Sequence, residues 1–445
     1  MWFNKGAKAR AKHANAQEPL LAMDIGSNKI RLIVGEVNDN GEVNVTYFDE
    51  CPSDGVLNSS VSDIDKLSNK LSSLIESYEA ETEQTFSQCV IGMSGIHIES
   101  INYSGEANVP TGKITEIDRN TAIDHAAMYK FSESQHLIHV VPQAYFTKRD
   151  NEVSNPIGMS SSYIKVNAHL ITCNEDQEND LRAAFERLSS NISIDEVIYN
   201  GIAAADAVLS QEQKEIGVCL VDIGGGSTSV AVYDKGKLVM TFGLKLSGNS
   251  ITQHVATKLN LPLRVAEFAK RTCGLAHPCL LEDGPEFYSV TPKGYSDPCL
   301  ISVKELATNI GFELMDITRV VLNRVQGYYK ETGQSLALGA GFVITGGVAK
   351  TVGIDLLIQA TLKDDKVKTV VNIGKPRGVT YEGDEEEAAK LDSPEWATAI
   401  GLLRVAYSME QDRQRRREAV DAYKSQSGTV AKTLSWIKAW LAKEF

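Results

Sequence analysis

The chain of 445 residues is longer than one hydrophobic core usually supports, so two or more subdomains are expected. Its composition is that of a soluble globular protein, and the net charge of −13 argues against nucleic acid as a partner. The seven cysteines are odd in number and irregularly spaced, which favours a reducing cytoplasm over a disulfide scaffold, and no apolar run approaches the roughly 20 residues of a membrane-spanning helix.

Two strands around a tight turn are predicted after a basic tail. Residues 1–17 lack the apolar stretch of a signal peptide and are predicted to be a disordered tail. Residues 20–37 form two apolar runs around Asp24-Ile-Gly26, and the hydroxyl residue Ser27 follows directly. A third strand and a helix buried on one face are expected over 43–48 and 64–80.

Residues about 96–165 depart from this pattern and are predicted to contain strands and one helix. His136 and His139 could bind a metal or act in catalysis, but nothing at metal-ligand spacing accompanies them, so structural roles are predicted. Strands are expected over 89–95, 137–143 and 163–172, and helices over 118–131, 180–188 and 197–209.

The segment 217–234 repeats the first hairpin. Asp222 ends an apolar strand, three glycines (224–226) and Ser227 follow, and a second strand leaves. Consecutive glycines let backbone N–H groups approach a bulky anion closely. Asp222 is badly placed to attract phosphate directly, but a bound Mg²⁺ prefers carboxylate, water and phosphate oxygens together. The repeat therefore predicts an ATP·Mg site between two α/β halves.

Two helices follow the second hairpin. Gly248 lies at the start of the first helix, where its lack of a side chain leaves the backbone open to the phosphates. The second helix, 262–272, carries Glu267 and Lys270 on one face. This pair is either a surface ion pair or a ribose contact. A zinc site at the nearby cysteines and histidine is not favoured, because their spacing matches no ordinary zinc module. These residues are Cys273, His277, Cys279 and Cys299.

Residues 340–349 are predicted to form a strand, a turn at Gly346 and Gly347, and a helix. This is a third place where glycines would let the backbone approach the ligand closely, and it would suit the flat face of a nucleoside. Neither a P-loop nor a Rossmann fingerprint is present. Further helices are expected over 304–329 and 394–408, the latter with Ser393 as N-cap.

The C-terminal end is predicted to be a charged linker over 409–428 and an amphipathic helix over 429–445. One stripe of that helix is apolar, tryptophans flank it, and lysines lie opposite or at the edge. This arrangement suits the membrane–water interface, and the alternative is a helix docked on its own body or on a partner. The predicted lipid-contacting residues are Leu434, Trp436, Ile437, Trp440, Leu441 and Phe445.

With these motifs the chain resembles the FtsA family of actin-like bacterial cell-division proteins over nearly its whole length. The hairpins at Asp24 and Asp222 and the segment Thr345-Gly-Gly-Val-Ala349 belong to the wider actin, hexokinase and heat-shock ATPase superfamily. More specific to the family are Met93-Ser-Gly-Ile-His97, Asn155-Pro-Ile-Gly-Met159, His169-Leu-Ile-Thr172, Val371-Asn-Ile-Gly-Lys-Pro376 and Ala399-Ile-Gly-Leu-Leu403.

The resemblance implies an α/β, actin-like (ribonuclease H-like) two-lobed ATPase fold with the family's 1C subdomain and a C-terminal amphipathic helix. The expected subdomains are 1A over 18–87 with 166–210 and 381–408, 1C over 88–165, 2A over 211–247 with 331–380, and 2B over 248–330.

The resemblance also implies partners and a location. These are self-association into filaments, the FtsZ C-terminal peptide on 2B, other division proteins on 1C, and lipid at the cytoplasmic face of the inner membrane at the septum. The family's nucleotide is ATP or ADP with Mg²⁺. The predicted contacts are Asp24, Gly26, Ser27, Asn28, Lys29, Asp222, Gly224, Gly225, Gly226, Ser227, Gly248, Glu267, Lys270, Gly346 and Gly347, with Asp24 and Asp222 at the metal.

Two departures predict slow hydrolysis at best. Asn200-Gly201 stands where hydrolytic members of the superfamily carry Glu-Pro, and asparagine cannot act as a general base. Ser229 stands where the second phosphate motif often has another aspartate. A nucleotide-gated scaffold is therefore predicted, and the alternatives are an actin-like pilus-assembly adaptor or a small-molecule kinase or phosphatase on the same fold.

Overall fold

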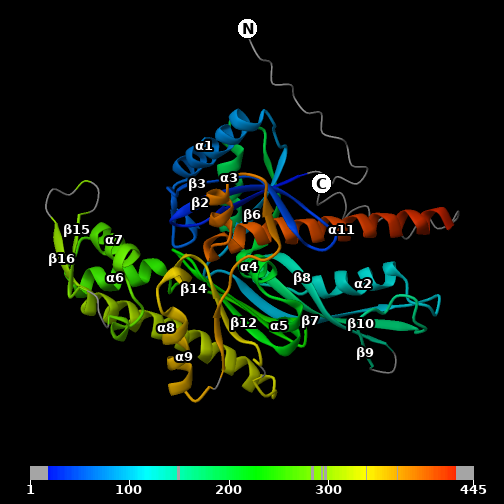
Figure 1. Cartoon of the computed structure of the whole chain (residues 1–445). Coiled ribbons are helices and arrows are strands. Elements are labelled where there is room, and N and C mark those ends of the chain that lie inside the picture. Colours follow the sequence, from blue (N-terminus) through cyan, green and yellow to red (C-terminus); the bar gives the residue numbers. More distant parts are fainter. Residues whose placement is uncertain are drawn as a thin grey trace, which may run out of the picture.

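Two mixed sheets form the centres of two lobes, and each is built around one predicted hairpin (Figure 1). In the first sheet the strand order is β11-β6-β1-β2-β3-β19, with β1, β2 and β3 antiparallel and β6 and β11 parallel to β1. Its strands are β1 (Leu20–Ile25), β2 (Lys29–Val37), β3 (Val43–Pro52), β6 (Gln88–Met93), β11 (Ser193–Tyr199) and β19 (Val379–Tyr381). The computed structural model describes residues 19–147, 151–281, 285–291, 294, 298–336, 338–367 and 369–426.

The second sheet repeats this arrangement, with the order β14-β13-β12-β17-β18. Again three antiparallel strands are continued by parallel ones, so the internal repeat predicted from the two Asp-Ile-Gly motifs is a repeat of whole sheets. Every residue of β12 is buried, as expected of a strand covered on both faces. The strands are β12 (Val218–Ile223), β13 (Thr228–Asp234), β14 (Lys237–Leu244), β17 (Gly341–Thr345) and β18 (Val371–Ile373).

The helices of the first lobe pack closely where their residues are small. A Cβ on Gly401 would lie 1.8 Å from the carbonyl oxygen of Ala203, so these two helices approach each other at backbone distance. The helix predicted over 197–209 begins only at Asn200, because its first residues complete a strand of the sheet. The elements are α1 (Ile64–Thr82), α3 (Glu175–Glu186), α4 (Asn200–Val208), α10 (Glu385–Leu391), the 3₁₀ turn η3 (Pro394–Trp396) and α11 (Ala397–Gln426).

The second lobe carries its helices in a separate core around the long helix α8 (Figure 1). The predicted helix 304–329 lies within α8, whose N-cap is Ser302. A two-stranded hairpin, β15–β16, projects from the same lobe. The elements are α5 (Gln211–Ile216), α6 (Gly248–Lys258), α7 (Leu263–Cys273), η1 (Pro278–Leu280), β15 (Phe287–Val290), β16 (Cys299–Ser302), α8 (Val303–Glu331), η2 (Gly347–Lys350) and α9 (Ile354–Asp364).

A third unit is inserted into the first lobe and has its own sheet and core. Its strand order is β7-β10-β8-β9, and α2 covers one face. The boundaries 88–165 need correction at both ends, because β6 belongs to the first lobe's sheet and β10 pairs along its length within the inserted sheet. The elements are β7 (Glu99–Asn108), α2 (Glu116–Ala127), β8 (Gln135–Thr147), β9 (Glu152–Val153) and β10 (Tyr163–Asn174).

The charged segment predicted as a linker over 409–428 is helical as far as Gln426, where α11 ends. Arg413 forms ion pairs with Asp195 at 2.9 Å and Glu196 at 3.3 Å, and Arg416 reaches Asp124 of α2 at 3.4 Å. The linker prediction was therefore wrong for this part, because its charges pair with the body instead of facing only water.

Residues 427–445, which include the predicted amphipathic helix, lie outside the described residues, as do residues 1–18. Among the helices that are described, none is both long and apolar enough to cross a membrane.

Candidate functional site

The turns of the two repeated hairpins face each other across a cleft of about 360 Å³ between the lobes. That volume is within the range of small-molecule sites. The structure brings every residue predicted to contact the nucleotide to the wall of this one cleft. They come from β1 and β12, from the turns after these strands, from the first residue of β2, from α6 and α7, and from the turn after β17.

The first carboxylate, Asp24, has a cation directly across the hairpin. The strand register pairs Asp24 with Arg31, whose Nη1 lies 3.6 Å from Asp24 Oδ2. Arg31 also contacts Glu395 at 2.9 Å and Glu50 at 3.1 Å, so one guanidinium serves three carboxylates. Burial raises the pKa of Asp24, and Arg31 opposes that shift. For Glu395, burial raises the pKa, but Lys350, Arg31 and Lys29 outweigh it and hold the pKa below its ordinary value.

The second carboxylate, Asp222, faces a serine across its own hairpin. The register pairs Asp222 with Ser229, and Oδ2 of Asp222 accepts a hydrogen bond from Thr398 at 3.0 Å. Burial raises the pKa of Asp222 to about 7, and the nearby charge of Asp24 adds to the shift. Gly346 has φ +85°, and a Cβ there would lie 2.3 Å from Asp222 Oδ1, so a side chain at this position would collide with the carboxylate.

The glycine turn of the second hairpin touches the first hairpin directly. A Cβ on Gly226 would lie 2.0 Å from Ser27 Oγ, and a Cβ on Gly225 would lie 2.6 Å from the Asn28 amide. The same turn is joined to the start of α6, because Gly248 N–H donates to Gly224 at 2.9 Å. The absence of side chains at these glycines is therefore what lets the two lobes meet over the cleft.

Glu267 and Lys270 form an ion pair of 2.6 Å inside the cleft rather than on an outer surface. Lys270 Nζ also donates to the carbonyl oxygen of Gly248 at 2.8 Å and to Thr252 Oγ1 at 2.6 Å. These three contacts use the three protons of the ammonium group and fasten α7 to the first turn of α6. Burial lowers the pKa of Lys270, and the carboxylate of Glu267 opposes that shift.

The residues present fit a divalent cation with a phosphate ligand. Two buried carboxylates approach from the ends of β1 and β12. Burial, together with the nearby charge of Asp24, raises the pKa of Asp222, so the negative charge of the ionised Asp222 is poorly compensated. A hard cation would compensate that charge and take its remaining ligands from water and phosphate oxygens. Asn200 lies beside Asp24, with its Nδ2 donating to Oδ1 at 3.5 Å, and its own Oδ1 is buried without a hydrogen-bond partner.

Among the cleft-lining residues that the sequence reasoning missed, five have polar contacts with residues of the two hairpins. Arg31 had a usable signal, because a hairpin turning at Ser27 and Asn28 places position 31 opposite position 24. The others come from distant segments and have no such local signal. These residues are Arg31, Ser59, Ser94, Glu395 and Thr398.

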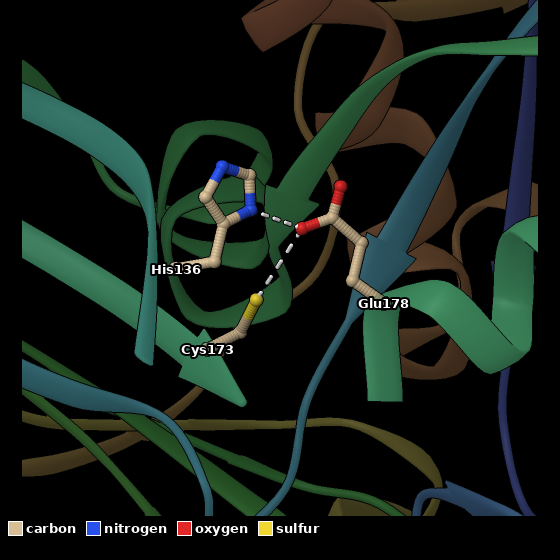
Figure 2. Close-up of side chains that lie close together, drawn as sticks. All are labelled: His136, Cys173 and Glu178. Carbon is tan, nitrogen blue, oxygen red and sulfur yellow. Dashed lines mark hydrogen bonds and ion pairs between the residues drawn. The ribbon is translucent and has the colours of Figure 1, made fainter. Parts of the chain in front are cut away.

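His136 and His139, for which structural roles are predicted, both have polar partners in the structure, and His136 forms with Cys173 and Glu178 a group of side chains that could hold a metal ion. His136 Nδ1 lies 2.5 Å from Glu178 Oε2, and Cys173 Sγ lies 3.7 Å from the same oxygen (Figure 2). Arg182 occupies the other oxygen of Glu178 at 2.7 Å, so His136 and Arg182 together already surround this carboxylate with donors. His139 is buried and accepts the N–H of Tyr199 at 3.0 Å. Over the described part of the chain, the cysteines and histidine at 273–299 form no cluster of metal ligands.

Comparison with known proteins decides the family. The family described as cell division protein FtsA matches residues 219–401, and the domain described as the SHS2 domain inserted in FtsA matches residues 95–172. The chain is 30% identical to cell division protein FtsA of Neisseria meningitidis serogroup B over 425 residues, 95% of this chain and 98% of the relative. The chain belongs to the FtsA family. FtsA of Escherichia coli K12 is 29% identical over 441 residues, 97% of this chain and 99% of the relative.

Solved structures agree on the fold. A structure of the PilM–PilN type IV pilus biogenesis complex superposes with a TM-score of 0.60 at 16% identity, covering 86% of this chain and 97% of that one. At this identity the likeness concerns the fold alone, which is the actin-like, two-lobed α/β fold expected for FtsA. The SHS2 match over 95–172 also coincides with the inserted sheet, whose strands run from Glu99 to Asn174.

Proposed function

We propose that this FtsA-family protein binds ATP with Mg²⁺ in the cleft, polymerises on the cytoplasmic face of the inner membrane and anchors FtsZ filaments at the division septum. The observation that carries the nucleotide part is the pairing of Asp24 and Asp222 between two phosphate turns in one cleft. Asp24 and Asp222 would hold Mg²⁺ through their carboxylates, and the glycine turns would offer N–H groups to the phosphates. The cation would neutralise phosphate charge when bound.

Slow hydrolysis at best is part of this proposal. At the end of β11, beside Asp24, the chain offers Asn200, an amide that has no proton-accepting basicity. Ser229, opposite Asp222, is likewise no base at neutral pH. Such a site suits a nucleotide-dependent switch of assembly better than a kinase, which would need a carboxylate to accept a proton from its substrate.

The membrane part of the proposal rests on the apolar stripe of 429–445. One such helix gives weak and reversible binding, since each apolar side chain contributes only about 1.5–3 kcal/mol when fully buried. A polymer that presents many helices gains avidity through effective concentration. The acidic body, with a net charge of −13 for the whole chain, would be repelled by anionic lipid only within about 8 Å at physiological salt.

Subdomain 2B, here about 248–330, is the proposed site for the FtsZ C-terminal peptide. Large apolar side chains are exposed on α7 and on the β15–β16 hairpin of this region, as expected of a surface that a peptide covers. They are Leu263, Phe268, Phe287, Tyr288 and Leu300. Other division proteins are proposed to bind the inserted unit 95–174.

Co-sedimentation with anionic liposomes tests the proposal. The full chain should pellet with the vesicles and form filaments on them with Mg·ATP, whereas a chain ending at Gly428 should stay in the supernatant. Trp436→Ala with Trp440→Ala should weaken pelleting strongly, and Lys432→Ala, on the polar side of the helix, should weaken it far less. Equal pelleting of the full and shortened chains would contradict membrane anchoring and favour the pilus-type adaptor or enzyme alternatives.

A further inference from the structure

Two serines lie in the cleft outside both copies of the repeated hairpin. Ser59 is at the tip of a short hairpin formed by β4 (Val56–Leu57) and β5 (Ser60–Val61), and Ser94 directly follows β6. Both line the same cleft as the two carboxylates. Neither belongs to the phosphate turns that the repeat predicts.

Their hydroxyl groups connect the phosphate turns of the two lobes. The N–H of Ser59 donates to Ser27 Oγ at 2.8 Å, and Ser59 Oγ lies 2.8 Å from Ser227 Oγ. Ser227 Oγ in turn donates to Ser94 Oγ at 3.1 Å. Because a hydroxyl has one proton, Ser227 donates its proton to Ser94 and accepts the proton of Ser59. A bound phosphate, as a charged acceptor, would draw the proton of Ser59 away from this neutral partner. The proton of Ser94 is then available for an acceptor beyond this chain of hydroxyls.

Ser59 has a backbone conformation that glycine adopts more readily. Asn58 and Ser59 have φ of 50° and 62°, so both residues of this two-residue loop are left-handed. Such loops favour Asn-Gly, and a residue with a Cβ at the second position is strained. Asn58 suits its place, but Ser59 does not. A strained residue in a ligand cleft suggests a function for its side chain, and the hydroxyl is what serine has and glycine lacks.

We propose that the hydroxyls of Ser59 and Ser94 bind the terminal phosphate of a nucleoside triphosphate and set the preference for triphosphate over diphosphate. This inference rests on the proposed nucleotide binding. The contacts of Ser59 with Ser27 and Ser227 mark the end of the cleft where the lobes touch, whereas Glu267 and Lys270 belong to α7 in the second lobe. A terminal phosphate held by the two turns would lie beside both serines, because Ser59 and Ser94 contact the turn residues Ser27 and Ser227. Its charged oxygens would accept strong hydrogen bonds from the two hydroxyls.

The test compares Mg·ATP and Mg·ADP affinities of the full-length chain with those of Ser59→Gly, Ser59→Ala and Ser94→Ala. Each variant should lose roughly tenfold in ATP affinity, the size expected for one hydrogen bond to a charged group, and change ADP affinity by less than about threefold. Ser59→Gly should melt a few degrees above Ser59→Ala, because glycine relieves the left-handed strain. Ser77→Ala, which removes an exposed hydroxyl on α1, should change neither affinity.

The outcomes separate this inference from the proposed function. Equal losses for both nucleotides, unchanged ATP affinity in the variants, or normal ATP affinity in Ser59→Gly alone would overturn the role of the two hydroxyls while leaving nucleotide binding in place. Failure of the unmodified chain to bind either nucleotide would instead overturn the proposed function. A selective loss of ATP affinity in all three variants, together with the higher melting temperature of Ser59→Gly, supports the inference.

Discussion

The two halves of the repeat place an aspartate at the same point of the same hairpin but give it opposite surroundings. In the first hairpin the cross-strand neighbour of Asp24 is Arg31, and in the second the neighbour of Asp222 is Ser229. Both carboxylates are buried, and burial raises the pKa of each. Only Asp24 has a guanidinium within ion-pair distance, at 3.6 Å. The cross-strand residue therefore decides whether the carboxylate has a permanent counter-ion. Arg31 supplies one to Asp24, whereas Ser229 supplies none to Asp222.

This difference suggests a division of labour between the lobes. Arg31 joins Asp24 to Glu50 and Glu395, and thereby fastens the first hairpin to β3 and to the turn before α11. Asp222 has Thr398 as a hydroxyl donor and the charge of Asp24 nearby. A cation brought by a nucleotide would compensate Asp222 more than Asp24. We therefore expect the first half to contribute chiefly to stability and the second half to respond more strongly to a bound nucleotide.

Removing the guanidinium group of Arg31 should have the largest effect on stability. Arg31→Met keeps much of the aliphatic stem but leaves Asp24 and Glu395 without their shared partner, so the free energy of unfolding should fall by about 3–5 kcal/mol. Urea unfolding at pH 7.5 without nucleotide measures this. Arg187→Met, which breaks the exposed pair with Asp65, serves as the control and should cost less than about 1 kcal/mol. Equal losses in the two variants would contradict the role given to Arg31.

Removing the charge of Asp222 should stabilise the ligand-free protein in a pH-dependent way. Its pKa is about 7 in the folded state against 3.8 in the unfolded chain. Between these values the folded state keeps a proton that the unfolded chain loses, so stability falls as pH rises towards 7 and stays low above it. The free energy of unfolding of Asp222→Asn should therefore exceed that of the unmodified chain by about 4 kcal/mol at pH 8 and by less than half of that at pH 5.

Asp24→Asn is the matched control for this pH dependence. It removes the partner carboxylate of Arg31, so its gain at pH 8 should be smaller than that of Asp222→Asn, or negative. Thermal or urea unfolding at the two pH values compares the variants. Equal gains for Asp222→Asn at pH 5 and pH 8 would show that the raised pKa is absent.

The smallest effect is expected at Thr398. Thr398→Val removes the hydroxyl that donates to Asp222. The free energy of unfolding should fall by about 1 kcal/mol at pH 8, where the carboxylate is ionised, and by less at pH 5. Thr361→Val removes a buried hydroxyl that donates to the carbonyl oxygen of Leu357, and its effect should not depend on pH. A pH-independent loss at Thr398 would mean that its hydroxyl does not support the charge of Asp222.

Much of the fold could be predicted from the sequence because the repeated motif is local. The strands around Asp24 and Asp222 are apolar runs interrupted by short glycine turns, and both the pattern and the turn lie within 18 residues in each copy. The same locality explains the agreement for α1 and α8, whose apolar spacing marks one buried face.

What could not be predicted depends on contacts between distant segments. Glu395 and Thr398 reach the cleft from the turn and helix near the end of the described chain, and only the folded arrangement places them beside Arg31 and Asp222. The helical course of 409–426 was missed because its arginines looked like solvated charges, whereas they meet carboxylates on β11 and α2. The turn at Ser59 could likewise not be predicted, because its left-handed residues are Asn58 and Ser59 and it contains no glycine that would mark it in the sequence.

The most direct test of the central claim is calorimetric titration of Mg·ATP into the full-length chain at pH 6.5, in two buffers of different ionisation enthalpy. With a pKa of about 7, Asp222 holds about three quarters of a proton at this pH, and a bound cation should release most of it. The account predicts binding with proton release in the unmodified chain, and in Asp222→Asn weaker binding without that release. Binding with the same affinity and the same proton release in both proteins would contradict it.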